Sequence, residues 1–229
     1  GSGTNWGQAF TNIQQALDIA GDNDEVRLAG HTFGVSSQLQ WTNGANVRIT
    51  GGWQGIGGPG ANDPATWPTV VRRASAPTNR IFFISGVTGT LAKLTVQGGI
   101  SENPYLGGGL FISNSTVTID TCRIVSNSVS HGTQWGPAIR GGGLYAIASA
   151  VTITNSVFEG NASRSLYRRN TAVGGGGTFE GGGSVTIVDS SFVRNEATGG
   201  GGPGNELDII YGGAVYTAVP LVARNSVFY

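Results

Sequence analysis

Apolar and polar residues alternate along much of the chain, and the alternation returns at a fixed spacing. The segments 117–119, 151–153 and 185–187 all read Val-Thr-Ile. An apolar-polar-apolar period of two predicts a strand with one buried face. Because the three segments begin 34 residues apart, each belongs to one copy of an internal repeat.

Other columns keep this spacing through the first three copies, and the step to the fourth copy is two or three residues longer. A glycine tract opens each copy, and an aromatic residue follows it in the column Phe111, Tyr145, Phe179 and Tyr216. A second strand carries a large apolar residue in the column Ile124, Phe158, Phe192 and Phe228. Three residues later comes the column Asn127, Asn161 and Asn195. Length variation falls between the asparagine of one copy and the glycines of the next, as expected when the repeats stack.

A single copy cannot bury its own apolar face, whereas stacked copies pair every strand with the layers above and below it. Like residues then lie over one another, so that Phe and Ile fill the interior and Asn side chains bond along the stack. The pattern therefore predicts an all-β fold, a right-handed single-stranded parallel β-helix. An antiparallel sandwich competes, but it does not require equal columns at this period.

Upstream of the regular repeats, strand-like segments continue at 24–33, 45–53, 69–74, 79–85 and 89–99. Phe10, Ile13 and Leu17 have helical spacing, which predicts a short helix that covers the end of the stack. We predict a single domain over 1–229, with a capping helix region at 1–23, irregular coils at 24–106 and regular repeats at 107–229. The last coil is expected to be incomplete, so that it either continues in a longer protein or stacks on a neighbouring chain.

Composition narrows the function classes. Of 229 residues 40 are Gly and only 11% are charged, which is atypical of helical domains and coiled coils. The net charge is zero, so no basic field favours nucleic acid. No apolar run is long enough for a membrane helix, and we expect no membrane insertion by this chain. The single cysteine, Cys122, stands in a serine column and is interpreted as a small inward residue.

Three motifs carry a family resemblance: GGAV at 212–215, FEGN at 158–161 and FVRN at 192–195. They resemble the GGA[ILV] and FxxN repeats of the polymorphic outer membrane protein type, found in bacterial surface proteins. The opening segment 3–33 is similar to the cap and first coil of secreted right-handed β-helix proteins. The resemblance implies a protein that is secreted or held at the bacterial outer surface. Related coils serve adhesins, polysaccharide lyases, glycoside hydrolases and passive stalks, so it implies the fold and not one activity.

Catalysis on such a scaffold needs paired carboxylates, or a calcium ion held by a carboxylate cluster. Asp120 and Asp189 lie two predicted coils apart, about 10 Å along the axis, and are interpreted as turn residues. We assign no catalytic residue and expect no cofactor. Asp189, Glu206 and Asp208 could gather a Ca²⁺ ion, although no calcium-loop motif supports this.

Aromatic residues are the remaining candidates for contacts. Tyr145 and Tyr216 belong to the aromatic column, whose orientation the sequence leaves open and for which core packing is favoured. Trp135 and Tyr167 lie in the variable loops, which in a stacked fold often form the binding face.

These observations favour a rigid extracellular rod that serves as a structural, adhesion or assembly module. Its loops at 128–140, 162–174 and 196–211 would contact a surface glycan or protein, and its open last coil would bind a neighbouring chain or a second copy. The alternatives are a carbohydrate-active β-helix enzyme, either lyase or hydrolase, and a non-catalytic glycan-binding solenoid.

Overall fold

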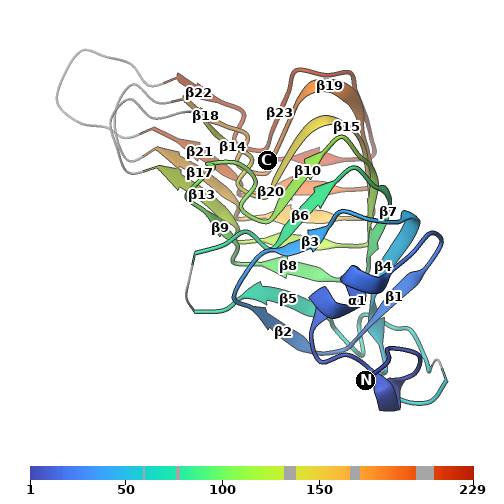
Figure 1. Ribbon diagram of the computed structural model, residues 1–229. Helices are drawn as coiled ribbons and strands as arrows, with labels where there is room; N and C mark the ends of the chain where they lie inside the picture. Colours follow the sequence, from blue (N-terminus) through green and yellow to red (C-terminus); the bar gives the residue numbers. More distant parts are fainter. Residues whose placement is uncertain (59, 76–77, 132–137, 166–170, 200–208) are drawn as a thin grey trace.

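The structure is a computed structural model that describes residues 1–58, 60–75, 78–131, 138–165, 171–199 and 209–229. Its helices are the 3₁₀ helix η1 (Trp6–Gln8) and the α-helix α1 (Ile13–Ile19). The Asn12 side chain caps α1 by accepting a hydrogen bond from the backbone N–H of Gln14, and the helix buries Ile13 and Leu17. The predicted helix is therefore present at the N-terminal end of the stack (Figure 1).

The largest sheet has eleven strands among the described residues, and all its strand pairs are parallel. One row of strands runs β3–β6–β10–β15–β19–β23, and the other runs β1–β4–β7–β11–β15–β19–β24, because β15 and β19 extend through both. The strands are β1 (Glu25–Ala29), β3 (Leu39–Trp41), β4 (Ala45–Trp53), β6 (Phe82–Ser85), β7 (Thr88–Ala92), β10 (Leu110–Ser113), β11 (Thr116–Asp120), β15 (Leu144–Thr154), β19 (Gly177–Val188), β23 (Val215–Thr217) and β24 (Leu221–Arg224).

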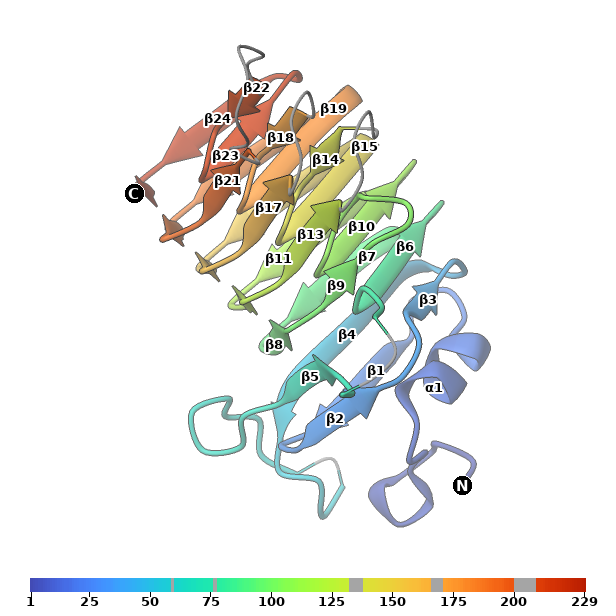
Figure 2. The same ribbon diagram turned by 90° about the vertical axis from the view of Figure 1, so that its left-hand side faces the viewer.

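Three smaller parallel sheets accompany it, of which only the first begins in the first layer. The first contains β2 (Thr32–Val35), β5 (Val70–Arg73), β8 (Thr95–Gln97), β12 (Arg123–Val125), β16 (Val157–Glu159), β20 (Ser191–Val193) and β25 (Val227–Phe228). The second contains β9 (Ile100–Ser101), β13 (Ser128–His131), β17 (Ala162–Ser165) and β21 (Glu196–Thr198), and the third contains β14 (Ile139–Arg140), β18 (Thr171–Val173) and β22 (Ile209–Tyr211). Figure 2 shows the strands rising in chain order from one end of the molecule to the other.

The register confirms that residues one repeat apart are neighbours. Val117 pairs with Val151, and Val151 with Val185. Phe158 pairs with Phe192, and their rings stack with centroids 4.4 Å apart. Since these strands run parallel, the antiparallel sandwich is excluded.

The interior is filled by the predicted apolar columns. Ile119, Ile153 and Ile187 are 0% exposed, as are Phe158 and Phe192. Burial of a side chain of this size contributes about 1.5–3 kcal/mol, so the columns supply the main stabilisation of the stack. A left-handed backbone marks the same corner of successive repeats, at Asn155, Asp189 and Asn225, where Asn and Asp are tolerated better than other side chains.

The asparagine column forms a hydrogen-bonded ladder. Oδ1 of Asn161 accepts from the backbone N–H and from Nδ2 of Asn127, both at 3.0 Å. Oδ1 of Asn195 accepts from the same two donors of Asn161, at 3.0 and 2.9 Å. Because each amide also donates to a backbone carbonyl of the layer before it, the ladder ties one layer to the next.

The last layer leaves its inward positions uncovered. Leu221 and Phe228 continue buried columns, since they pair with Val185 and Phe192, yet both are 41% exposed. Tyr229 is 80% exposed. No described strand pairs with the outer edges of β24 and β25. This end of the stack is thus an apolar surface with unpaired backbone groups.

Candidate functional site

A row of aromatic side chains lies on the outside of the largest sheet. Phe83 pairs with Phe111, and Phe111 with Tyr145, across β6, β10 and β15. Their ring centroids are 5.2 and 5.5 Å apart. The neighbours of Phe111 along β10 belong to the buried core and Phe111 does not, so the row faces outward. Phe111 therefore does not pack in the core, whereas Tyr145 in the same row is only 3% exposed. We call Phe83, Phe111 and Tyr145 the outer aromatic row.

Phe179 does not join this row, contrary to its place in the predicted aromatic column. Thr178 pairs with Tyr145, and Phe179 pairs with the buried Ala146. The glycine tract of this repeat has four residues, 174–177, so the register is one residue away from the predicted one. Phe179 therefore points inward and is 2% exposed. Tyr216 pairs with Thr178 and returns an aromatic ring to the outer face.

Two arginines approach the outer aromatic row. The guanidinium carbon of Arg80 lies 4.9 Å from the centroid of the Phe111 ring. One layer further on, Nε of Arg140 is 3.1 Å from a carboxylate oxygen of Glu180. The same oxygen accepts a hydrogen bond from the Tyr145 hydroxyl at 2.7 Å. Burial, followed by this contact with Glu180, raises the pKa of Tyr145 and keeps its phenol neutral.

Residues near Arg80 add polar groups to this part of the surface. Nη2 of Arg80 donates to Oγ of Ser101 at 3.1 Å and to the carbonyl oxygen of Pro104 at 3.4 Å. The neighbouring rings of Tyr105 and His131 meet edge to face, with centroids 4.2 Å apart, and His131 is buried. The repeat pattern does not single out Arg80 or Tyr105, which lie outside the repeated columns, and it places His131 in a variable loop as a solvated or locally bonded histidine.

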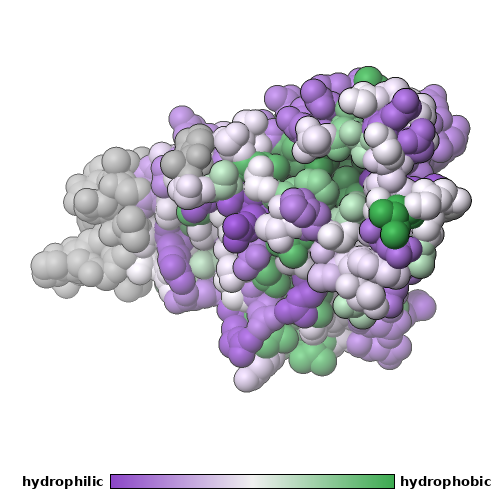
Figure 3. All heavy atoms as spheres, turned by 90° about the horizontal axis from the view of Figure 1, so that it is seen from below, coloured by the Kyte–Doolittle hydropathy of each residue, from purple (hydrophilic) through white to green (hydrophobic). Residues whose placement is uncertain are grey.

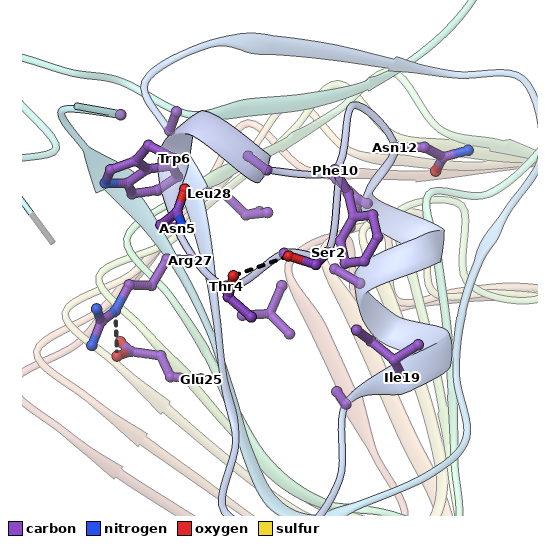
Figure 4. A pocket seen from close by; sticks show the side chains of 18 of the residues that line it. Ser2, Thr4, Asn5, Trp6, Phe10, Asn12, Ile19, Glu25, Arg27 and Leu28 are labelled. Atoms are coloured by element: carbon purple, nitrogen blue, oxygen red, sulfur yellow. Dashed lines mark hydrogen bonds and ion pairs between the residues drawn. The ribbon is translucent and has the colours of Figure 1, made fainter. Parts of the chain in front are cut away.

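Apart from the outer aromatic row, a hollow lies at the N-terminal end of the stack. Its volume is about 830 Å³, and it lies between the N-terminal segment, α1 and β1. Figure 3 shows apolar side chains in the middle of this end, surrounded by polar ones. Trp6, Phe10, Ile19 and Leu28 line it in Figure 4, with the Arg27–Glu25 ion pair at its edge. The hollow is the part of the first layer that α1 leaves uncovered.

Of the residues predicted to bind a metal ion or to make contacts from the loops, the structure describes only some. Trp135, Tyr167, Glu206 and Asp208 lie outside the described residues. Asp189 occupies a left-handed corner. Within the described ranges no group of three or more His, Cys, Asp or Glu side chains is placed to hold a metal ion. In the same ranges no helix is long and apolar enough to cross a membrane.

Cys122 is buried, and its backbone N–H donates to Oγ of Ser156 at 3.0 Å. Ser156 and Ser190 make the equivalent contact in the following layers. Burial raises the pKa of the Cys122 thiol to about 12. A neutral thiol without access to solvent is a packing group and not a nucleophile.

Comparison with known proteins adds no relative: no family model, curated protein or solved structure matches the chain.

Proposed function

We propose that the chain is a right-handed parallel β-helix, of the kind found in surface proteins with polymorphic outer membrane protein type repeats. In this proposal it is secreted or held at the bacterial outer surface, where it serves as a rigid, non-enzymatic structural or adhesion module. The observation that carries the proposal is the in-register stacking of identical buried residues through successive repeats. Like-on-like columns of this kind support a rod, because each layer fixes the next without long-range contacts.

The chemistry of the acidic residues also supports a structural role. Glu159 lies between Arg123 and Arg194 of the adjacent layers, and Arg164 pairs with Glu196. Asp120 accepts hydrogen bonds from Thr154 and Asn155. These carboxylates hold layers together. Release of reducing ends or unsaturated sugars from acidic polysaccharides by the purified chain would contradict the non-enzymatic role and favour the lyase or hydrolase alternative.

The open last coil supports a second part of the proposal, head-to-tail binding of another copy. β24 stands in the same row as β1, and β25 stands in the same sheet as β2. A second copy could therefore continue both sheets with parallel strands. Beyond the Arg27–Glu25 ion pair, the N-terminal end carries Asp18, Asp22 and Asp24, whereas segment 209–229 has Arg224 and no acidic side chain. Opposite charges at the two ends favour this orientation over contact between like ends.

A matched pair of variants tests the contact. Leu221 and Val222 are neighbours with similar exposure, 41% and 45%, but Leu221 continues an inward column and Val222 an outward one. We expect Leu221→Lys to abolish concentration-dependent self-association in analytical ultracentrifugation. Val222→Lys should associate as the unmodified chain does. If the unmodified chain is monomeric at every concentration, or both variants associate normally, the head-to-tail contact is wrong.

A further inference from the structure

Arg80 is a charged side chain in an unusually dry position. It is 5% exposed, and burial lowers the pKa of its guanidinium to about 10. A pKa of this size leaves the group positively charged at neutral pH. Removal of a full charge from water is costly unless an anion or several hydrogen bonds replace the water. Whether Arg80 has such an anion or enough hydrogen bonds is decided by the groups around its guanidinium.

Its partners in the described residues are all neutral. Nη2 contacts Ser101 and Pro104, and the guanidinium lies over Phe111. No carboxylate of the described residues comes within 4.0 Å of it. Arg140, by contrast, has its carboxylate in Glu180.

Some donors of Arg80 remain available. Nε and Nη1 make no hydrogen bond to the described residues. Neither atom is among the fully enclosed polar atoms without a partner, which in the described part of the chain are in Trp41, Trp53 and Asn79. Both therefore keep some contact with solvent, although Arg80 as a whole is 5% exposed. Three N–H groups of this fixed cation have no hydrogen-bond partner among the described residues.

The surroundings favour an anion at this point. The edges of aromatic rings carry partial positive charge, and the Phe83 and Phe111 rings stack face to face, which leaves their edges for contact with an anion. Phe83 and Phe111 are half-buried and lie in adjacent layers, which suits an extended ligand more than an isolated ion.

We propose that Arg80 anchors a binding site for an oxyanion, the carboxylate of a sugar acid in an acidic glycan. The guanidinium supplies charge-assisted hydrogen bonds to the carboxylate, and the sugar ring lies along Phe111 and Phe83. The site does not depend on the scaffold role proposed above, because it uses one residue that does not recur in the repeats. A free inorganic oxyanion has the same chemistry, and an acidic peptide is the competing macromolecular partner.

Calorimetric titration of the purified chain tests the site, with trigalacturonate, neutral trigalactose, sulfate and a glutamate-rich peptide as probes. We expect trigalacturonate to bind, and to bind less tightly as salt is added. Arg80→Gln should weaken this binding about 10- to 100-fold, the range for loss of a charge-assisted hydrogen bond. Arg72→Gln removes an exposed arginine and the same net charge, so it should bind as the unmodified chain does.

Each other outcome decides against part or all of the proposal. Equal binding of trigalactose, equal binding by Arg80→Gln, or no binding of any probe overturns the site. Sulfate as tight as trigalacturonate, or a tighter peptide, overturns the sugar acid as ligand. If Arg80→Gln does not fold, the Nε–H resonance of Arg80 in the unmodified chain replaces it as readout. A shift of that resonance with trigalacturonate supports the site, and an unchanged resonance shows that Arg80 only braces the turn at 101–104.

Discussion

Removal of the Asn161 side chain tests whether the asparagine ladder holds the layers together. Asn161 is 0% exposed, so water cannot take the place of its amide. Its Oδ1 is the acceptor for the backbone N–H of Asn127, and its Nδ2 donates to the carbonyl oxygen of Ile124 at 2.8 Å. Asn161 is not among the left-handed residues, so Asn161→Ala removes these bonds without adding backbone strain.

The expected magnitude follows from the groups left behind. A buried N–H without a partner costs about 1–3 kcal/mol, and each further amide bond that is lost costs about 0.5–1.5 kcal/mol. Asn161→Ala orphans the N–H of Asn127 and removes three further bonds, from Nδ2 of Asn127, to Ile124 and to Asn195, so the sum is about 2.5–7.5 kcal/mol. Against a typical stability of about 5–15 kcal/mol, this is a large fraction of the total.

Urea unfolding followed by circular dichroism measures the effect. Thr118→Ala is the control, because Thr118 lies on the outer face of β11 and its hydroxyl has no hydrogen-bond partner among the described residues. We expect the control to change the free energy of unfolding by less than about 0.5 kcal/mol. Asn127→Ala and Asn161→Ala together should cost less than the sum of the two, because they share bonds. Equal losses for Asn161→Ala and Thr118→Ala would refute the ladder as a stabilising element.

Two further substitutions test the packing between layers. Gly142→Ala would place a methyl group on the backbone of Ala162, so we expect a lower melting temperature and a cost of at least about 1–3 kcal/mol. Gly34→Ala, whose added carbon meets no heavy atom within 4 Å, should melt as the unmodified chain does. The pKa of the Cys122 thiol is raised from 9.0 to about 12 on folding, so the unfolded chain deprotonates first as the pH rises. Between pH 9 and about 12, the unmodified chain should therefore lose up to about 1.4 kcal/mol of stability per pH unit relative to Cys122→Ser. If the stabilities of the two chains change in parallel with pH, the thiol is not buried.

The interior could be predicted from the sequence because it obeys one rule. A residue that lies over its equivalent in the next layer has to match it in size and bonding, so the columns of Phe158 and Asn161 recur at a constant spacing. The same rule explains why Cys122 can replace serine, since only a small side chain fits the corner. The spacing of the repeats in the sequence is therefore enough to predict the parallel pairing of the strands and the residues of the buried columns.

The register of the residues within one repeat is harder to predict from the sequence. Alignment on the glycines predicts that Phe179 shares a column with Phe111 and Tyr145, but the four-residue tract at 174–177 places it opposite Ala146, in the core. Strand β19 returns to the common register only after the pair of Ile147, where the pairing with β15 shifts. A tract of glycines has no side chains to fix its register, so its length alone does not say which residue faces inward.

The outer surface is not constrained by stacking, and this is why the repeat pattern in the sequence does not predict the candidate site. Stacking demands that a feature recur in every layer, whereas recognition of a ligand needs a feature at one place. Arg140 has a carboxylate in the next layer and Arg80 has none, although both approach the same aromatic row. Stacking does not account for a buried charge that breaks the repeat and has no carboxylate in the next layer. Arg80 is such a group, and its uncompensated charge is the strongest physical reason to look for a ligand on this face of the molecule.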